Sequence, residues 1–500
     1  MSDPMVQPGD PPRLLAKTGI VGFDAVLGGG FTPNRLYLLE GAPGSGKTTL
    51  ALQFLREGVR NGEPVLYVTL SETEEELRDV SASHGWSLDG ITIRELNPAG
   101  NNLAGEDHYT MFHPSEVELG ETTKAILDDV QRINPARVVF DSLSELRLLA
   151  GSALRYRRQI LALKLFFTGR KCTVLMLDDM TSANHDLQVQ SIAHGAIRLE
   201  QLAPNYGAER RRLMVLKYRG MAFRGGYHDY LIRRGGLQVF PRLVASEREV
   251  EPRTDRIASG IEELDELLGG GLDRGTSTLI VGAPGTGKSS LAAFYARAAT
   301  QQGENAALFI FDESTKTLVN RSKGLGLDLQ TPITAGQLTV QQIDPAEMAP
   351  GEFVHRICDE VEKRRASVVV IDSLNGYLNA MPEERFLVIQ LHELLTYLGH
   401  AGVATILIGA HQGLIGSQMN APVEASYLAD TVVLMRYYEI RGEVRQAVSV
   451  MKKRGGAHER SIRDFRLTGN GIQVGPPLRN YRGILTGVPV EEPPRSETPT

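Results

Sequence analysis

The stretch Gly41-Ala42-Pro43-Gly44-Ser45-Gly46-Lys47-Thr48 decides the fold of this chain. It matches the pattern G-x-x-x-x-G-K-[ST], which forms a loop that binds phosphate groups. Glycines let the backbone turn so that successive N–H groups face a polyphosphate, and the start of the following helix adds partial positive charge. The stretch therefore predicts a binding site for a nucleoside triphosphate.

The polar residues of this loop have separate expected tasks. We expect Lys47 to reach the β- and γ-phosphates, and the Thr48 hydroxyl to bind Mg²⁺. Residues 36–40 read as a short apolar strand and residues 49–55 have the apolar spacing of a helix, which is the order that the motif requires. The expected nucleotide contacts of this loop are Gly41, Gly44, Ser45, Gly46, Lys47, Thr48 and Thr49.

The same loop occurs a second time, at residues 282–289. Gly41 and Gly282 are separated by 241 residues, and so are Lys47 and Lys288. We infer a duplicated domain of about 240 residues, with a site for ATP and its Mg²⁺ in each copy. The expected nucleotide contacts of the second loop are Gly282, Gly285, Thr286, Gly287, Lys288, Ser289 and Ser290.

Strands and helical stretches alternate within each copy. The expected strands are 64–70, 137–142 and 173–177 in the first copy, and 307–311, 367–373 and 404–408 in the second. Their apolar residues form continuous runs, which is typical of strands covered on both faces. The chain therefore predicts an α/β fold with two tandem P-loop domains, each a mainly parallel twisted sheet flanked by helices. The expected division is a tail over 1–13, domains over 14–246 and 247–475, and a C-terminal loop and tail over 476–500.

Composition narrows the class of protein. Hydrophobic residues make up 42% of the 500 residues and charged residues 23%, which are the proportions of a soluble globular protein. No apolar run approaches the roughly 18 residues of a membrane span, and residues 1–13 lack the apolar core of a secretory signal. A net charge of −6 argues against a nucleic-acid partner. Cys172 and Cys358 are far apart and read as buried apolar residues, so we expect a reducing, cytoplasmic compartment.

Each copy has an aspartate at the end of an apolar strand, Asp141 in the first and Asp372 in the second. A carboxylate at this edge of a parallel sheet can hold Mg²⁺. We expect Thr48 with Asp141, and Ser289 with Asp372, to form the two metal sites. The alternative reading is an aspartate that caps a turn.

Further acidic residues follow the strand that lies between these two motifs. They are Glu72 in the first copy and the pair Asp312 and Glu313 in the second. Because ligands bind at the carboxyl ends of parallel strands, we expect these carboxylates to orient or deprotonate the attacking group. The copies differ, since Ser71 stands where the second copy has Asp312. The alternative reading is a solvated acidic loop.

Late in each copy a pair of cations precedes a glycine: Lys217 and Arg219 in the first, Lys452 and Arg454 in the second. Alternation along a strand places both members of a pair on one side. A cation supplied in trans accelerates phosphoryl transfer by several orders of magnitude, so we expect each subunit of a ring to supply its pair to a neighbour's nucleotide. The alternative is a solvated basic strand. Gln412 follows a core strand and is a candidate sensor of the γ-phosphate, whereas the first copy has aspartates there.

Together these residues resemble the KaiC family, a branch of the RecA-like ATPases, over nearly the whole chain. The resemblance rests on the duplicated glycine-rich leads over 17–30 and 257–271, the paired P-loops, and the two Lys-x-Arg-Gly strands. Residues 437–443 (YYEIRGE) and 479–487 (RNYRGILTG) are especially similar. The resemblance implies RecA-like domains in a double-ring homohexamer with ATP at subunit interfaces. It further implies slow ATPase activity in the N-terminal ring, and autokinase and autophosphatase activity in the C-terminal ring.

In that family a Ser and a Thr side by side receive phosphate from the adjacent subunit. The corresponding residues here are Ser426 and Tyr427, so the serine is kept and the threonine is replaced. Asp312 stands where the family has a glutamate, one methylene longer. The short final segment leads us to expect no coupling to a KaiA-like partner. A signalling partner of the KaiB-like or response-regulator type fits the resemblance.

The leading hypothesis is therefore a hexameric, ATP-driven signalling ATPase that phosphorylates itself, of the type found in biological clocks. One alternative is a DNA-dependent ATPase of the RecA or DnaB type, which shares the P-loop core. A second is a scaffold in which ATP only holds the ring together and a partner reads the nucleotide state.

Overall fold

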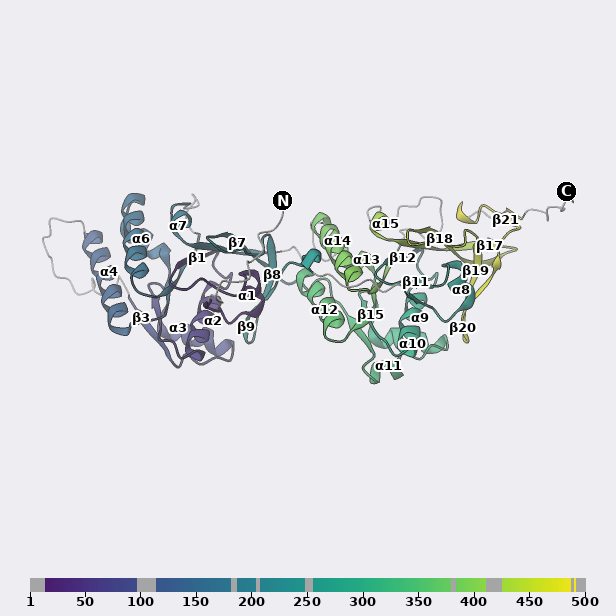
Figure 1. Cartoon of the computed structure of the whole chain (residues 1–500), viewed down its shortest axis with the longest axis horizontal. Coiled ribbons are helices and arrows are strands. Elements are labelled where there is room, and N and C mark those ends of the chain that lie inside the picture. The colour runs from purple at the N-terminus through teal and green to yellow at the C-terminus, as the bar shows by residue number, and fades with distance from the viewer. Residues whose placement is uncertain are drawn as a thin grey trace, which may run out of the picture. The chain divides into compact units, whose positions relative to one another are not determined.

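The computed structural model describes residues 14–96, 114–180, 187–203, 207–247, 255–378, 384–410, 425–486 and 490–491. The chain divides into two compact units, Met1–Arg242 and Leu243–Thr500, and each is considered by itself. Within the described residues, each unit has one nine-stranded sheet with helices packed on it (Figure 1).

The sheet of the first unit has the strand order β3-β2-β4-β5-β1-β6-β7-β8-β9. Its strands are β1 (Leu36–Gly41), β2 (Val65–Thr69), β3 (Ile91–Glu95), β4 (Arg137–Asp141), β5 (Thr173–Asp178), β6 (Gly195–Leu202), β7 (Arg210–Tyr218), β8 (Tyr227–Arg233) and β9 (Gly236–Phe240). Neighbours from β3 to β6 are parallel, and those from β6 to β9 are antiparallel. The carboxyl end of β1 therefore lies between the parallel neighbours β5 and β6.

The second unit repeats this topology in the order β14-β13-β15-β16-β12-β17-β18-β19-β20. Its strands are β12 (Ser277–Gly282), β13 (Asn305–Ile310), β14 (Leu338–Gln342), β15 (Ala366–Asp372), β16 (Ala404–Ala410), β17 (Thr431–Ile440), β18 (Glu443–Lys453), β19 (Ile462–Thr468) and β20 (Gly471–Pro477). Two small pairs stand apart, β10 (Arg256–Ile257) with β11 (Leu272–Asp273) and β21 (Tyr481–Arg482) with β22 (Val490–Glu491). The duplication seen in the sequence is thus a duplication of the whole sheet.

Each sheet has an apolar core on both faces, because successive residues of a strand point to opposite sides. In β1, Tyr37 and Leu39 join one cluster, whereas Leu36 and Leu38 join the other. The first cluster includes α1 (Val21–Val26), α2 (Lys47–Arg60) and α3 (Glu74–Ser83). The second includes α4 (Pro114–Ile133), α5 (Leu143–Ala150), α6 (Ala153–Thr168) and α7 (Leu187–Ile192). Continuous apolar strands follow from this double cover.

The second unit is built in the same way. On one face lie α8 (Glu262–Leu267), α9 (Lys288–Gln301), α10 (Thr315–Gly324) and α11 (Gln330–Thr334). On the other lie α12 (Pro350–Glu362), α13 (Leu374–Leu378) and α14 (Glu384–His400). The short elements α15 (Ala425–Leu428), η1 (Ala245–Glu247) and η2 (Ile484–Thr486) complete the described chain.

These observations confirm the predicted fold class of two tandem α/β domains with mainly parallel sheets. The six strands predicted from continuous apolar runs are β2, β4, β5, β13, β15 and β16, with ends within two residues of the prediction. No helix in the described part of the chain is long and apolar enough to span a bilayer.

A left-handed glycine begins the helix after each P-loop. Gly46 precedes α2 with φ of 92°, and Gly287 precedes α9 with φ of 100°. A Cβ on Gly46 would lie 2.5 Å from Cδ1 of Ile232, and one on Gly287 would lie 3.0 Å from the ring of Phe465. L-residues rarely adopt this φ, and here they also lack room. Glycine is therefore required for the loop to close over the helix start.

Replacing Gly46 with alanine should destabilise the first unit more than the same change at Gly62. Gly62 also has positive φ, at 72°, but nothing lies within 4 Å of its added Cβ. We expect Gly62→Ala to cost about 1 kcal/mol from backbone strain, and Gly46→Ala to cost about 2 kcal/mol or more because a clash is added. Urea unfolding of the two variants measures this. Equal losses would contradict the steric argument.

Candidate functional site

The P-loop of the first unit holds its lysine inside the protein. The Lys47 ammonium donates hydrogen bonds to the carbonyls of Gly41 at 2.9 Å and Ala42 at 3.1 Å, and the residue is 6% exposed. It also forms an ion pair with Asp179 Oδ1 at 2.9 Å. A buried cation must be paired and hydrogen-bonded. In the first unit Asp179 pairs with the charge of Lys47, and the two loop carbonyls accept its hydrogen bonds.

Asp141, at the end of β4, is buried next to the loop. One of its oxygens, Oδ2, accepts hydrogen bonds from Thr48 Oγ1 at 3.4 Å and from the Tyr67 hydroxyl at 2.5 Å. Burial raises the pKa of Asp141, while the hydrogen bond from Tyr67 lowers it. A hydroxyl beside a carboxylate is an oxygen donor set of the kind that Mg²⁺ prefers, so these residues fit the predicted metal site.

Glu72 follows β2 in a turn that Thr69 holds. The Glu72 N–H donates to Thr69 Oγ1 at 2.9 Å, and that hydroxyl donates to the Glu72 carbonyl at 2.7 Å. Burial and, next, the charge of Asp141 raise the pKa of Glu72 to about 7, and the charge of Lys47 opposes the shift. Within the described residues its buried Oε2 has no hydrogen-bond partner. A carboxyl that ionises near neutral pH beside a metal-site acid is suited to accept a proton.

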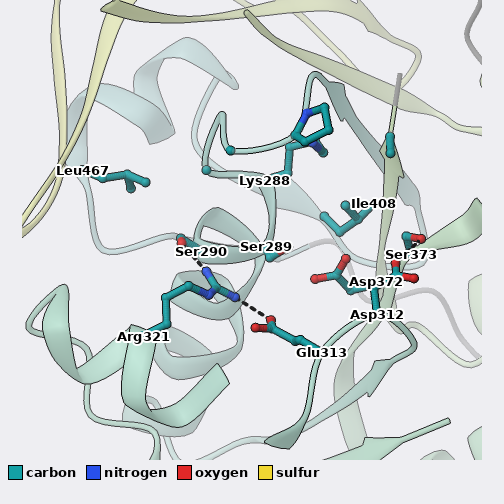
Figure 2. Close-up of a pocket in the computed structure, with 14 residues that line it drawn as sticks. Lys288, Ser289, Ser290, Asp312, Glu313, Arg321, Asp372, Ser373, Ile408 and Leu467 are labelled. Carbon is teal, nitrogen blue, oxygen red and sulfur yellow. Dashed lines mark hydrogen bonds and ion pairs between the residues drawn. The ribbon is translucent and has the colours of Figure 1, made fainter. Parts of the chain in front are cut away.

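The second unit has a cavity of about 470 Å³ at the equivalent place (Figure 2). The predicted site residues that line it are Gly285, Gly287, Lys288, Ser289, Ser290, Asp312, Glu313 and Asp372. The Lys288 ammonium again donates to two carbonyls of its own loop, those of Gly282 at 2.9 Å and Ala283 at 2.8 Å. Burial lowers its pKa. Ser45 in the first loop and Thr286, its counterpart in the second, are fully buried.

Three carboxylates, those of Asp312, Glu313 and Asp372, line this cavity. Asp312 Oδ2 accepts a hydrogen bond from Ser373 Oγ at 2.7 Å, and Glu313 forms an ion pair with Arg321. Burial raises the pKa of Asp372, and the charges of Glu313 and Asp312 raise it further. The structure thus brings the predicted metal-site acid and both predicted base candidates together, although their roles stay predictions.

The basic pair of the first unit lies at the C-terminal end of α7. The Lys217 ammonium donates to the carbonyls of Gln190 at 2.7 Å and Ala193 at 2.8 Å, and Arg219 donates to that of Ser191 at 2.9 Å. Burial lowers the pKa of Lys217, and the charge of Arg219 lowers it further. Cations are stabilised at the negative end of a helix, so this position has a structural cause.

The basic pair of the second unit repeats the arrangement at α15. Lys452 donates to the carbonyl of Ala429 at 2.7 Å. Arg454 donates to the carbonyl of Tyr427 at 2.9 Å and to Asp430 Oδ1 at 3.3 Å. The predicted action of either pair on a neighbour's nucleotide needs a second copy of the chain and stays a prediction.

The remaining predicted residues lie at or beyond the edge of the described chain. Tyr427 is 55% exposed on α15. Ser426 belongs to the same helix, but its side chain lies outside the described residues, as does Gln412.

Three residues at these sites were missed by sequence reasoning: Tyr67, Asp179 and Arg321. Tyr67 reads as one more apolar strand residue, and Arg321 as an ordinary helix cation. Asp179 was noticed only as a departure from Gln412. A comparison of the two copies residue by residue carries the missing signal, because Tyr67 and Arg321 correspond to Leu308 and Val80.

Each of the two RecA-like α/β units places a P-loop lysine, a hydroxyl and a strand-end aspartate at one edge of its sheet. This arrangement defines a tandem ATP-binding P-loop protein. A family model described as "ATPase: KaiC" matches residues 16–244 and 257–479, most of both units. The chain belongs to the KaiC family, which confirms the predicted membership.

Two curated relatives match nearly the whole length of this chain. The "Circadian clock protein KaiC3" of Synechocystis sp. is 27% identical over 484 residues, covering 95% of this chain and 94% of that protein. The "Circadian clock oscillator protein KaiC" of Parathermosynechococcus lividus is 28% identical over 490 residues, covering 95% and 87%. The similarity thus extends through both domains.

The raised pKa of Glu72 predicts a pH-dependent N-terminal site. In a chain whose C-terminal carboxylates are replaced (Asp312→Asn with Glu313→Gln), ATP turnover should rise between pH 6 and 8. The base form of Glu72 is the deprotonated one, and with a pKa of about 7 only roughly a tenth is present at pH 6. Adding Glu72→Gln should abolish the rise. Turnover that is flat over this range would contradict the assignment.

The ion pair between Lys47 and Asp179 predicts that Asp179 weakens ATP binding at the N-terminal site. Phosphates and this carboxylate compete for one ammonium, so Asp179→Asn should tighten binding about five- to tenfold. The measurement is a titration with a fluorescent ATP analogue in a Lys288→Ala background. Asp128→Asn, at an exposed position of α4, is the matched control. Unchanged or weaker binding in Asp179→Asn would refute the competition.

Proposed function

We propose that this protein is a homohexameric signalling ATPase in which both domains bind Mg-ATP and the C-terminal domain phosphorylates and dephosphorylates the chain itself. Proteins of this family are generally hexameric, and relatives along the full length are named as circadian clock proteins. A timing or signalling role, a cytoplasmic location and a protein partner that reads the phosphorylation state belong to this proposal.

At the N-terminal site, Lys47 would bind the nucleotide phosphates once Asp179 releases it. Thr48 and Asp141 would hold Mg²⁺, which supplies charge neutralisation at the phosphates when bound. Glu72 would take a proton from the attacking water. Its turn over Thr69 and its pKa of about 7 support this role.

At the C-terminal site, Lys288 would bind the phosphates, and Ser289 with Asp372 would hold Mg²⁺. Asp312 or Glu313 would accept the proton of a Ser426 or Tyr427 hydroxyl from the adjacent subunit. The hydroxyl oxygen bonds to the γ-phosphorus while the bond to the bridging oxygen of the β-phosphate breaks, which leaves ADP. The cavity that collects these carboxylates around Lys288 supports the proposal.

The observation that carries the proposal is the repeated arrangement of Lys-Arg pairs at helix ends. Arg454 is hydrogen-bonded to the carbonyl of Tyr427, so a cation proposed to act in trans is attached to the helix that bears the proposed phosphate acceptors. In the first unit Lys217 and Arg219 hold α7 in the same way. At the interface between two subunits, the helix with the phosphate acceptors and the cations that act in trans would then be positioned together.

The trans role predicts complementation between two inactive chains. One chain carries Lys47→Ala with Lys288→Ala and keeps the cations; the other carries Arg219→Ala with Arg454→Ala and keeps the P-loops. Each alone should lose ATP turnover at least about a hundredfold. A one-to-one mixture should regain up to about one quarter of the unsubstituted rate, because about that share of subunit pairs combines a bound nucleotide with intact cations.

Phosphopeptide mapping of the same mixture tests the kinase step. Phosphate should appear on Ser426 or Tyr427 of the mixed sample and on neither chain alone. Arg158→Ala, an exposed arginine of α6, serves as the control for loss of charge. A mixture as inactive as its components would refute action in trans. Turnover restored without any phosphate on the chain would reduce the protein to an ATPase whose partner reads only the nucleotide state.

A further inference from the structure

Arg321 connects two parts of the C-terminal site that the proposed mechanism treats separately. Its guanidinium donates to Glu313 Oε1 at 2.6 Å and to Ser290 Oγ at 2.6 Å. Figure 2 shows the guanidinium between these two side chains, with Asp312 and Asp372 beyond Glu313. Ser290 lies in the first turn of the helix after the P-loop, and Glu313 in the loop before α10. Arg321 therefore connects the carboxylate of Glu313 to α9, the helix that follows the P-loop.

The N-terminal site has no counterpart of this link at the equivalent positions. Val80 stands 241 residues before Arg321 and packs against the apolar core. Thr49, the counterpart of Ser290, lies 3.4 Å from His84 Nε2 through its hydroxyl. The buried Oε2 of Glu72 has no hydrogen-bond partner in the part of the chain that the structure describes. Glu313 is thus hydrogen-bonded to an arginine, whereas the Oε2 of Glu72, at the equivalent position, has no hydrogen-bond partner among the described residues.

The link restricts what Glu313 can do. A guanidinium is planar and permanently charged, and its charge-assisted hydrogen bonds to a carboxylate are among the strong ones. One oxygen of Glu313 is occupied by this bond, and the second bond, to Ser290, fixes the guanidinium in turn. The side chains of Arg321 and Glu313 are 34% and 22% exposed, so both border the cavity and neither is sealed in the core. The bond to Arg321 therefore restrains the orientation of the Glu313 carboxylate.

We propose that Arg321 is a positioning residue that suppresses ATP hydrolysis at the C-terminal site by restraining Glu313. Hydrolysis requires a water oxygen to bond to the γ-phosphorus, the bond to the β-phosphate bridge to break, and the water proton to pass to a carboxylate; ADP and inorganic phosphate result. Restraint of the carboxylate slows this reaction. The nucleotide is thereby kept for transfer to a protein hydroxyl, an inference that rests on the proposed kinase function of the same site.

The test compares ATP turnover in full chains that all carry Glu72→Gln, so that hydrolysis reports the C-terminal site while the N-terminal P-loop stays intact. Into this background go Arg321→Met, Arg321→Lys and, as the matched control, Lys323→Met at an exposed position of the same helix. We expect Arg321→Met to raise kcat about tenfold with little change in KM, because a freed general base acts in the chemical step. Arg321→Lys should lie between, since one ammonium cannot reproduce both directed bonds.

The outcomes separate this inference from the function on which it rests. A fall in kcat, or no change, in Arg321→Met would overturn the restraint while leaving the kinase proposal in place. An equal rise in Lys323→Met would show a general effect of charge and would also overturn it. Absence of both turnover and phosphate on Ser426 or Tyr427 from every chain, including the Glu72→Gln background and Arg321→Met, would remove the proposed C-terminal chemistry and this inference together.

Discussion

The structure depends on a lysine that folds back onto its own loop. In each unit the P-loop ammonium, buried to within a few per cent, is hydrogen-bonded to the first two carbonyls of the loop. Burying such a charge is costly unless its donors are satisfied, and the curved loop satisfies them with its own carbonyls. The left-handed glycines at Gly46 and Gly287 permit that curve, and the central parallel strand before each loop fixes where it begins. The ligand site is thus largely formed by the folding of the chain.

The same cradle has different charges around it in the two units. The N-terminal lysine shares its charge with Asp179, and the neighbouring acid is held by a tyrosine. In the C-terminal unit Leu308 replaces that tyrosine, a second carboxylate is added at Asp312, and Arg321 ties down the next one. The duplication thus keeps the backbone and the lysine of the phosphate-binding loop but changes the charged groups around it. Divided ATPase and kinase duties would require such a difference.

The sequence predicted the fold well because its signals are local and repeated. Continuous apolar runs ending in Asp141 and Asp372 placed the strands to within two residues, and the constant offset of 241 residues revealed the duplication. The residues missed, such as Tyr67 and Asp179, act across strand pairs, and no spacing rule says which of several nearby polar groups a side chain will choose. The motif predicted that Lys217 and Lys452 are functional residues, but it did not predict their hydrogen bonds to backbone carbonyls at α7 and α15. These helices are too short to be recognised from the periodicity of apolar residues.

The central claim is that each chain holds two nucleotides, one in each cradle. Equilibrium dialysis with Mg²⁺ and a non-hydrolysable ATP analogue measures it most directly, because it counts bound ligand without depending on turnover. The account predicts two nucleotides bound per chain, with Lys47→Ala and Lys288→Ala each removing a different one. A single bound nucleotide in the intact chain, or two that survive both substitutions, would contradict it.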